Sequence, residues 1–338
     1  MRKSPRTFAV AALVGAIVSL SAGLATAQYS PVDLGTLGGV FSVAHDINKR
    51  GQIVGRASLP SGEQHAFLWD GVMQDLGTLP GGHFSEAFAI NDRGQIAGWS
   101  DLDQSTCTLF DGCWHAFLWV DGAMTDLGGI DSRFQSYAYD INKGGDIAGI
   151  GNTADYPNDS WHALLWVDGV PNDLGSPAGA TNAFARGVND RGEAAGSWFD
   201  GAGAHAGVWT RRGFFALPAL PGDTYSEAYK INNRGVVVGV SQSHAVQWID
   251  GVIQDLGALP GDDRSTATDV NSRGEVVGYS FSGSTGYRAF VWSDGVMTPL
   301  PTPIAGGASQ ANGLNDRGDI VGMWDHGSAP HAIVWIKQ

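Results

Sequence analysis

The sequence contains only two cysteines, few basic residues and, after its first 27 positions, no long hydrophobic run. Two cysteines without metal-ligand spacing around them exclude a disulfide framework and a zinc site. The 20 Lys and Arg residues are outnumbered by 34 Asp and Glu residues. Such a surface disfavours nucleic acid and anionic lipid, which both recruit clustered cations. Beyond residue 27, no segment is long and apolar enough to insert into a membrane.

Common catalytic motifs are also missing. The chain has no Gly-x-Ser-x-Gly elbow, no His-Glu-x-x-His, no phosphate loop and no dinucleotide fingerprint. An active site assembled from several repeats would carry no such motif, so an enzyme is not excluded, but the sequence favours a non-enzymatic role. Helical periodicity with caps is absent after residue 27, which predicts an all-β protein.

The amino terminus predicts a secretory signal peptide over residues 1–27. Three basic residues precede an apolar stretch that ends in Ala25-Thr26-Ala27, the small-residue pattern of a cleavage site. A transmembrane anchor is the alternative, but the stretch is short for a bilayer span. Cleavage would leave residues 28–338 as a single domain with a formal charge of −17, because three of the 20 basic residues are lost. We therefore expect a periplasmic or secreted protein.

One loop carries both cysteines and several carboxylates. In an oxidising compartment, Cys107 and Cys113 are expected to form a disulfide that stiffens this loop. Asp101, Asp103 and Asp111 are weak candidates for Ca²⁺ ligands, because Ca²⁺ prefers oxygen donors. Their spacing does not match an EF-hand loop. We therefore expect no metal and no other cofactor, with calcium as the alternative.

Against this background one pattern recurs seven times. In each repeat an aliphatic residue is followed by an Asn, and a Gly stands three positions after that Asn. Further along the same repeat, an apolar run ends in a Trp. The Asn residues are Asn48, Asn91, Asn142, Asn189, Asn232, Asn271 and Asn315, and the Trp residues are Trp69, Trp119, Trp166, Trp209, Trp248, Trp292 and Trp335. Repeats of 39 to 51 residues, each with four strand-like pieces and two tight turns, match the blades of a β-propeller.

The two ends of the chain indicate how the repeats close. Residues 33–37 have the pattern of a fourth strand, whereas residues 331–335 form a third-type strand with no fourth strand after it. The amino-terminal strand can therefore complete the last blade, and a linear solenoid would need capping repeats that are not seen. The sequence predicts a closed seven-bladed propeller of four-stranded antiparallel blades.

Variation between repeats indicates where function lies. The loops between the second and third strands differ in length, and alternation of connections places them all on one face, which is where recognition is expected. Trp114, Trp161 and Tyr287 each stand just before a third strand, where a ring can stack on a sugar or a peptide side chain. Packing of the loop onto its own blade is the alternative.

A second set of variable residues lies three positions before each Asn. If the first strand is innermost, these residues surround the axis of the propeller. Their diversity is typical of positions that face a ligand. The alternative is that they pack between neighbouring blades. The set comprises His45, Phe88, Tyr139, Arg186, Tyr229, Thr268 and Asn312.

The units resemble a known family. Asp75-Leu-Gly-Thr-Leu79, Ala87-x-x-Ile-Asn-x-x-Gly94 and His65-Ala-Phe-Leu-Trp69 are similar to the HAF repeats of probable extracellular bacterial proteins. The resemblance covers the chain after the signal peptide and implies an exported repeat protein, without an activity or catalytic residues.

Three functions remain open from the sequence. The first is a non-enzymatic binding module that engages a carbohydrate or a protein at the cell envelope through its variable face. The second is a hydrolase or lyase that acts on an extracellular polysaccharide at the channel mouth, and the third is a structural component of the envelope.

Overall fold

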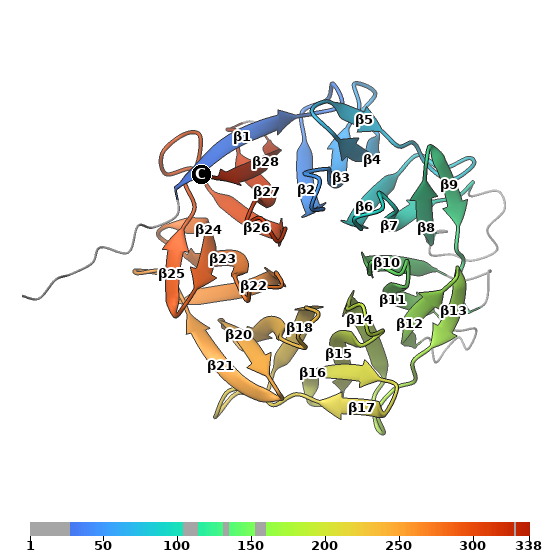
Figure 1. Ribbon diagram of the computed structural model, residues 1–338, viewed down its shortest axis with the longest axis vertical. Helices are drawn as coiled ribbons and strands as arrows, with labels where there is room; N and C mark the ends of the chain where they lie inside the picture. The colour runs from blue at the N-terminus through green and yellow to red at the C-terminus, as the bar shows by residue number, and fades with distance from the viewer. Residues whose placement is uncertain (1–27, 104–113, 131–134, 153–159, 328) are drawn as a thin grey trace, which may run out of the picture.

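The computed structural model describes residues 28–103, 114–130, 135–152, 160–327 and 329–338. These residues form seven four-stranded antiparallel sheets, which are arranged as blades around a central channel (Figure 1). The all-β seven-bladed propeller predicted from the repeats is therefore confirmed. None of the described residues belongs to a helix that is long and apolar enough to cross a bilayer.

Each blade is a meander whose first strand is nearest the axis (Figure 1). The first four blades are β2 (Ser42–Ile47), β3 (Ile53–Ser58), β4 (Gln64–Trp69) and β5 (Met73–Asp75); β6 (Ser85–Ile90), β7 (Ile96–Asp101), β8 (Trp114–Val120) and β9 (Ala123–Asp126); β10 (Ser136–Ile141), β11 (Ile147–Asn152), β12 (Trp161–Val167) and β13 (Val170–Asp173); and β14 (Asn182–Val188), β15 (Ala194–Asp200), β16 (Gly203–Thr210) and β17 (Gly213–Ala216).

The remaining blades follow the same order around the circle. They are β18 (Ser226–Ile231), β19 (Val237–Ser241), β20 (His244–Ile249) and β21 (Val252–Gly257); β22 (Arg264–Val270), β23 (Val276–Ser282), β24 (Gly286–Ser293) and β25 (Val296–Pro299); and β26 (Ser309–Leu314), β27 (Ile320–Asp325), β28 (Pro330–Lys337) and β1 (Tyr29–Gly35).

The last blade closes the circle with strands from both ends of the chain. The amino-terminal strand β1 lies beside β28 and pairs with it antiparallel (Figure 1). In this register Val32 faces Val334 and Tyr29 faces Lys337. Closure by the amino-terminal strand is therefore confirmed. The strand begins at Tyr29, four residues before the predicted start at Asp33, because the pairing continues to the end of β28.

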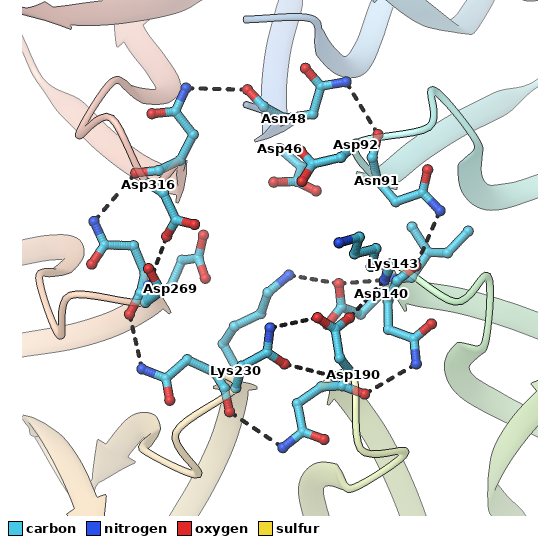
Figure 2. Close-up of a pocket in the computed structure, with 18 of the residues that line it drawn as sticks. Asp46, Asn48, Asn91, Asp92, Asp140, Lys143, Asp190, Lys230, Asp269 and Asp316 are labelled. Atoms are coloured by element: carbon cyan, nitrogen blue, oxygen red, sulfur yellow. Dashed lines mark hydrogen bonds and ion pairs between the residues drawn. The ribbon is translucent and has the colours of Figure 1, made fainter. Parts of the chain in front are cut away.

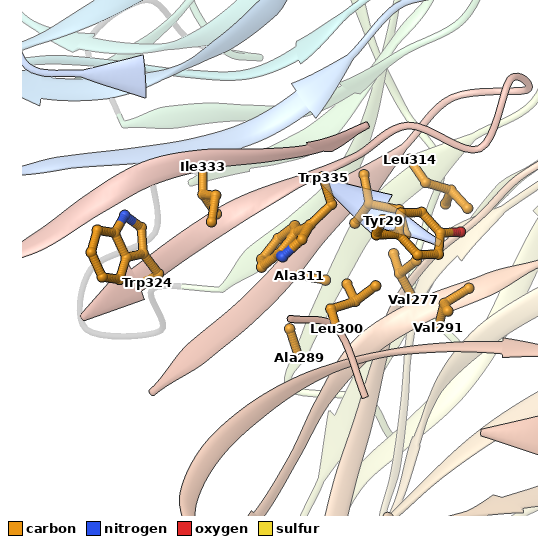
Figure 3. Close-up of a cluster of buried hydrophobic side chains, with 11 residues drawn as sticks. Tyr29, Val277, Ala289, Val291, Leu300, Ala311, Leu314, Trp324, Ile333 and Trp335 are labelled. Carbon is orange, nitrogen blue, oxygen red and sulfur yellow. The ribbon is translucent and has the colours of Figure 1, made fainter. Parts of the chain in front are cut away.

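The hydrophobic core is divided among the interfaces between blades. Each of seven buried clusters combines apolar side chains from two neighbouring blades. In the cluster between the last two blades, Val277 and Val291 of one blade pack with Trp335 and Leu314 of the next (Figure 3). The Trp that ends each third strand thus contributes to the contact between blades.

A β-bulge interrupts the first strand of every blade, at the residue three positions before the Asn. In the second blade the register shifts between Ala87 and Ala89, so Phe88 has no partner on β7. The same shift occurs in the other six blades. A bulge leaves its extra residue unpaired and changes the direction of its side chain.

The bulge also explains a glycine that recurs in the second strand. A Cβ added to Gly98 would lie 2.0 Å from the carbonyl oxygen of Glu86, which is far inside contact distance. The sequence predicts that the second strand ends at this glycine, but β7 continues to Asp101. The glycine is required because two backbones approach closely, and it does not mark the end of a strand.

Candidate functional site at the two ends of the channel

The bulge residues of all seven blades meet at the loop end of the channel. They line one hollow of about 490 Å³, together with the floor residues Asp46, Lys230 and Asp269 and with Thr266, Tyr279 and Gln310. We call this hollow the cup. Its size is typical of ligand sites, which span about 300–1,000 Å³. The prediction that the residues three positions before each Asn surround the axis is correct, because the first strand is innermost.

The wall of the cup has two chemically different arcs. From the first to the fifth blade the bulge residues are aromatic or cationic: His45 stacks on Phe88 at 4.7 Å between ring centroids, and Phe88 meets the edge of Tyr139 at 5.5 Å. The last two blades instead present mainly hydroxyl and amide groups, from Thr266, Thr268, Gln310 and Asn312, together with Tyr279. Thr268 and Asn312 also donate to the backbone carbonyls of Ala311 and Ala44 in the next blade. The cup therefore offers an apolar face opposite a hydrogen-bonding face.

Arg186 lies within the aromatic arc. Its guanidinium carbon is 5.8 Å from the ring centroid of Tyr139 and 5.4 Å from that of Tyr229, distances typical of cation–π contacts. One of its nitrogens is 3.3 Å from a carboxylate oxygen of Glu227. Arg186 is therefore already paired with a carboxylate and held against two rings.

A second ion pair lies behind the opposite part of the arc. The Nε2 atom of His45 is 2.8 Å from Glu86, and an Arg56 nitrogen is 3.4 Å from the same carboxylate. Burial opposes the ionisation of Glu86, but the hydrogen bond and charge of His45 outweigh it and lower the pKa of this carboxyl. Glu86 is therefore a stable anion that orients His45.

The floor of the cup is a charged layer formed by the residues that follow the bulges. Asp46, Asp140 and Asp269 each accept one backbone N–H from the next residue and one from a neighbouring blade; Val188 N, for example, donates to Asp140 at 2.7 Å. Lys230 donates to Asp140 at 2.7 Å. Since Asp46, Lys230 and Asp269 line both the cup and the hollow at the turn end, this layer separates the two.

Burial makes the floor sensitive to protonation. Desolvation raises the pKa of Asp269 to about 7, against the opposing charge of Lys230, and it raises the pKa of Asp46 in the same way. Although burial disfavours its charge, the surrounding carboxylates raise the pKa of Lys230. Lys230 is thus a permanent cation that holds the carboxylates together.

The turn end of the channel is built from the seven Asn residues. Each accepts backbone N–H bonds within its own turn, as Asn91 does from Arg93 and Gln95, and each donates its side-chain amide to the backbone carbonyl of the next Asn. These donations join all seven blades in one closed circle, including the step from Asn315 to Asn48 (Figure 2). The hollow inside the circle is smaller than the cup, at about 200 Å³.

The three aromatic residues predicted on the loop face do not enter the cup. Trp114 packs against Trp99 of its own blade at 4.8 Å, and Trp161 packs against Tyr137 at 5.6 Å. Both rings are partly buried in these contacts. For Trp114 and Trp161 the structure therefore supports packing onto their own blade over stacking on a ligand. Tyr287 also touches its own blade but remains 43% exposed, and it lines a separate groove.

The predicted calcium ligands and the disulfide fall partly outside the described residues. Asp111, Cys107 and Cys113 lie there, so the disulfide stays a prediction. Asp101 is buried, and its Oδ1 atom accepts the backbone N–H groups of His83 and Phe84. This carboxylate therefore caps the start of β6, which accounts for its position without a metal.

One group of side chains offers metal-ligand atoms close together. Asp33, His326 and His331 each present a ligand atom within 4.8 Å of the others. The two imidazoles, however, are stacked, 4.1 Å apart and 6° from parallel. A metal ion lies in the ring plane of an imidazole ligand, and two parallel planes at this separation cannot contain one ion. The arrangement supports a ring stack on the rim and not a metal centre.

Comparisons with known proteins show the fold alone. No family model matches the chain, and no curated protein matches it. Among solved structures, an oligogalacturonate lyase in complex with manganese has 11% identity and a TM-score of 0.54 over 93% of this chain and 94% of its own. The extracellular domain of a putative one-component system from B. thetaiotaomicron has 11% identity and a TM-score of 0.47 over 91% of this chain and 39% of its own. The SapL1 lectin in complex with alpha methyl fucoside has 11% identity and a TM-score of 0.41 over 88% of this chain and 95% of its own.

Proposed function

We propose that this protein is an exported, non-enzymatic binding protein whose cup holds an uncharged glycan. The observation that carries the proposal is the convergence of the seven bulge residues on one cup with an aromatic arc opposite a hydroxyl and amide arc. A sugar ring has an apolar face of C–H groups and a rim of hydroxyls, and the two arcs complement these two parts.

The charges around the cup support an uncharged ligand. Arg186 is paired with Glu227, and His45 is paired with Glu86. Both side chains therefore already have a carboxylate partner in the protein, which disfavours pairing with a carboxylate on the ligand. The floor adds three carboxylates to one ammonium group, which disfavours a polyanionic chain by like-charge repulsion.

Export rests on the predicted signal peptide and on the resemblance to HAF repeats. We infer cleavage after Ala27 and a location in the periplasm or outside the cell. Mass spectrometry of the protein isolated from periplasm and medium should find an amino terminus at Gln28. Recovery of the uncleaved chain in the membrane fraction would support the anchor alternative.

Binding can be tested by a glycan array, followed by calorimetry on variants of the two arcs. Phe88→Ala removes an aromatic wall and Asn312→Ala removes an amide, and each should weaken binding about tenfold, which corresponds to roughly 1.4 kcal/mol. Phe215→Ala is the matched control, because Phe215 is 51% exposed on the outer strand β17, away from the cup.

Two outcomes would contradict the proposal. One is an array on which the unaltered protein binds no glycan while an envelope pull-down recovers a protein partner through the cup. The other is full glycan affinity in both cup variants when their thermal midpoints show that they are folded.

A hydrolase or lyase remains the second candidate, because Asp269 in the floor has a pKa raised to about 7, as a catalytic acid requires. Against this role, both carboxylate oxygens of Asp269 accept backbone N–H groups. Incubation of the bound glycan with the protein, followed by mass analysis, distinguishes the candidates. Shorter products that disappear in Asp269→Asn would establish the enzyme.

A further inference from the structure

A second hollow adjoins the cup on the loop face. It lies between the last two blades, has a volume of about 360 Å³, and is lined by Tyr287, Gln310, Met323, Trp324 and Pro330 among others. We call it the blade 6–7 groove. Gln310 lines both the groove and the cup, and Tyr287 in the groove contacts Tyr279 in the cup at 5.5 Å between ring centroids. The two hollows are therefore neighbours that share a wall.

The groove is lined by Trp324, which stands where several repeats have a small polar residue. The fourth blade shows the same replacement, with Trp198 at this position and Pro177 in the preceding link. In three other blades the equivalent residue is Ser, and its hydroxyl accepts the backbone N–H of a Leu in the preceding link; the pairs are Ser100 with Leu79, Ser241 with Leu220, and Ser280 with Leu259. Pro303 replaces the Leu before the last blade, and proline has no N–H to offer. A Ser at this position would lose its partner, and a Trp occupies its place.

Trp324 brings an unused donor to the groove. Its side chain is only 3% exposed, and its indole N–H has no acceptor among the described residues. Figure 3 shows Trp324 at one end of the apolar cluster between the last two blades. Buried polar groups are nearly always hydrogen-bonded, but the indole N–H groups of Trp166 and Trp198 also lack an acceptor. What distinguishes Trp324 is its place in the wall of the groove, where a ligand that displaces the packing around the ring can supply an oxygen.

We propose that the blade 6–7 groove is a second subsite, which holds the units that follow the cup-bound end of the same uncharged glycan. This inference rests on the proposed function of the cup. The ring of Tyr287 is exposed for stacking on a sugar, and the indole N–H of Trp324 and the amide of Gln310 donate to sugar oxygens. The charged floor separates the cup from the turn end, so a chain cannot thread the channel and must leave over the rim.

A length series measures the two subsites separately. Calorimetry would use cello-oligosaccharides and N-acetylchito-oligosaccharides of two to six units, two uncharged series, with the unaltered protein. Affinity should increase at least tenfold between the shortest and the longest member of the series that binds. Tyr287→Ala and Trp324→Phe, which keeps an aromatic ring but removes the N–H, should abolish that increase and leave the affinity for the dimer unchanged.

Trp161→Ala is the matched control, because Trp161 occupies the position of Tyr287 in the third blade. It should retain the increase with length. The inference would be overturned if Trp161→Ala lost the increase in affinity with glycan length while Tyr287→Ala and Trp324→Phe kept it. That result would place the glycan over the third blade. Dimer binding without any gain from length would overturn the groove but not the cup, whereas no binding at any length would overturn both.

Discussion

The two ends of the channel are formed by residues only three positions apart in each repeat, yet they differ in every respect. At the turn end the same Asn occurs seven times and each amide bonds to the next blade. At the loop end the seven bulge residues are of six different types. A closed circle of side-chain bonds requires the same donor at every step, whereas a bulge is specified by the backbone and leaves its side chain free to vary.

The largest expected effect concerns Lys230, which lies at the boundary between the two ends. Lys230→Met leaves three buried carboxylates without their cation, and unpaired buried charge costs about 3–5 kcal/mol. The folded-state pKa values of Asp269 and Asp46 are raised above their ordinary values. These two carboxyl groups therefore favour the folded state at low pH, where they are protonated, and this contribution is lost as the pH rises. For Asp269 the loss is complete above a pH of about 7. Urea unfolding should therefore show a larger loss at pH 8 than at pH 5.

Lys49→Met is the control for this experiment, because Lys49 is 57% exposed on the turn face. Its substitution should change the free energy of unfolding little at either pH. An equal loss at pH 5 and pH 8 in Lys230→Met would contradict the assigned coupling between Lys230 and the floor carboxylates.

An intermediate effect is expected at the turn end. Asn91→Ala removes a donor to the carbonyl of Asn142 and an acceptor for two backbone N–H groups, which should lower the free energy of unfolding by about 2–3 kcal/mol. Glycan affinity should not change. Asn91→Asp keeps the acceptor but not the donor, so a fully stable Asn91→Asp variant would show that the circle contributes nothing.

The smallest effect on stability is expected in the cup. Tyr279→Phe removes a hydroxyl for which no hydrogen bond to another described residue is seen, so the free energy of unfolding should stay within about 0.5 kcal/mol of the original value. Glycan affinity should nevertheless decrease several-fold. Thermal unfolding and calorimetry on the same sample would test this separation of stability from binding, and a marked fall in the thermal midpoint would refute it.

The sequence predicts the architecture well because the repeat encodes it locally. Seven Asn turns, a constant frame and complementary strands at the two ends are sufficient to predict the blade count and the closure by β1. The bulge residues could be located as well, because their variation contrasts with the constant Ala that precedes each of them.

Contacts between blades were harder to predict. The sequence accounts for the Asn as a turn residue, but Asp or Ser can serve a turn equally well. The strict use of Asn was the available signal that a side-chain donor is needed, and it was missed. The sequence leaves open whether Trp114 stacks on a ligand or packs on its own blade, because its partner Trp99 lies in another strand whose facing residue the sequence does not reveal.

Closure between β1 and β28 has a consequence for the order of folding. Strand β1 acquires its partner only after β28 has been synthesised, so six complete blades can form while the seventh remains open. The disc is therefore locked by a single late event that joins sites about 300 residues apart, and loop closure over such a distance is slow compared with the formation of a blade. A chain released before β28 is complete would keep two unpaired sheet edges exposed.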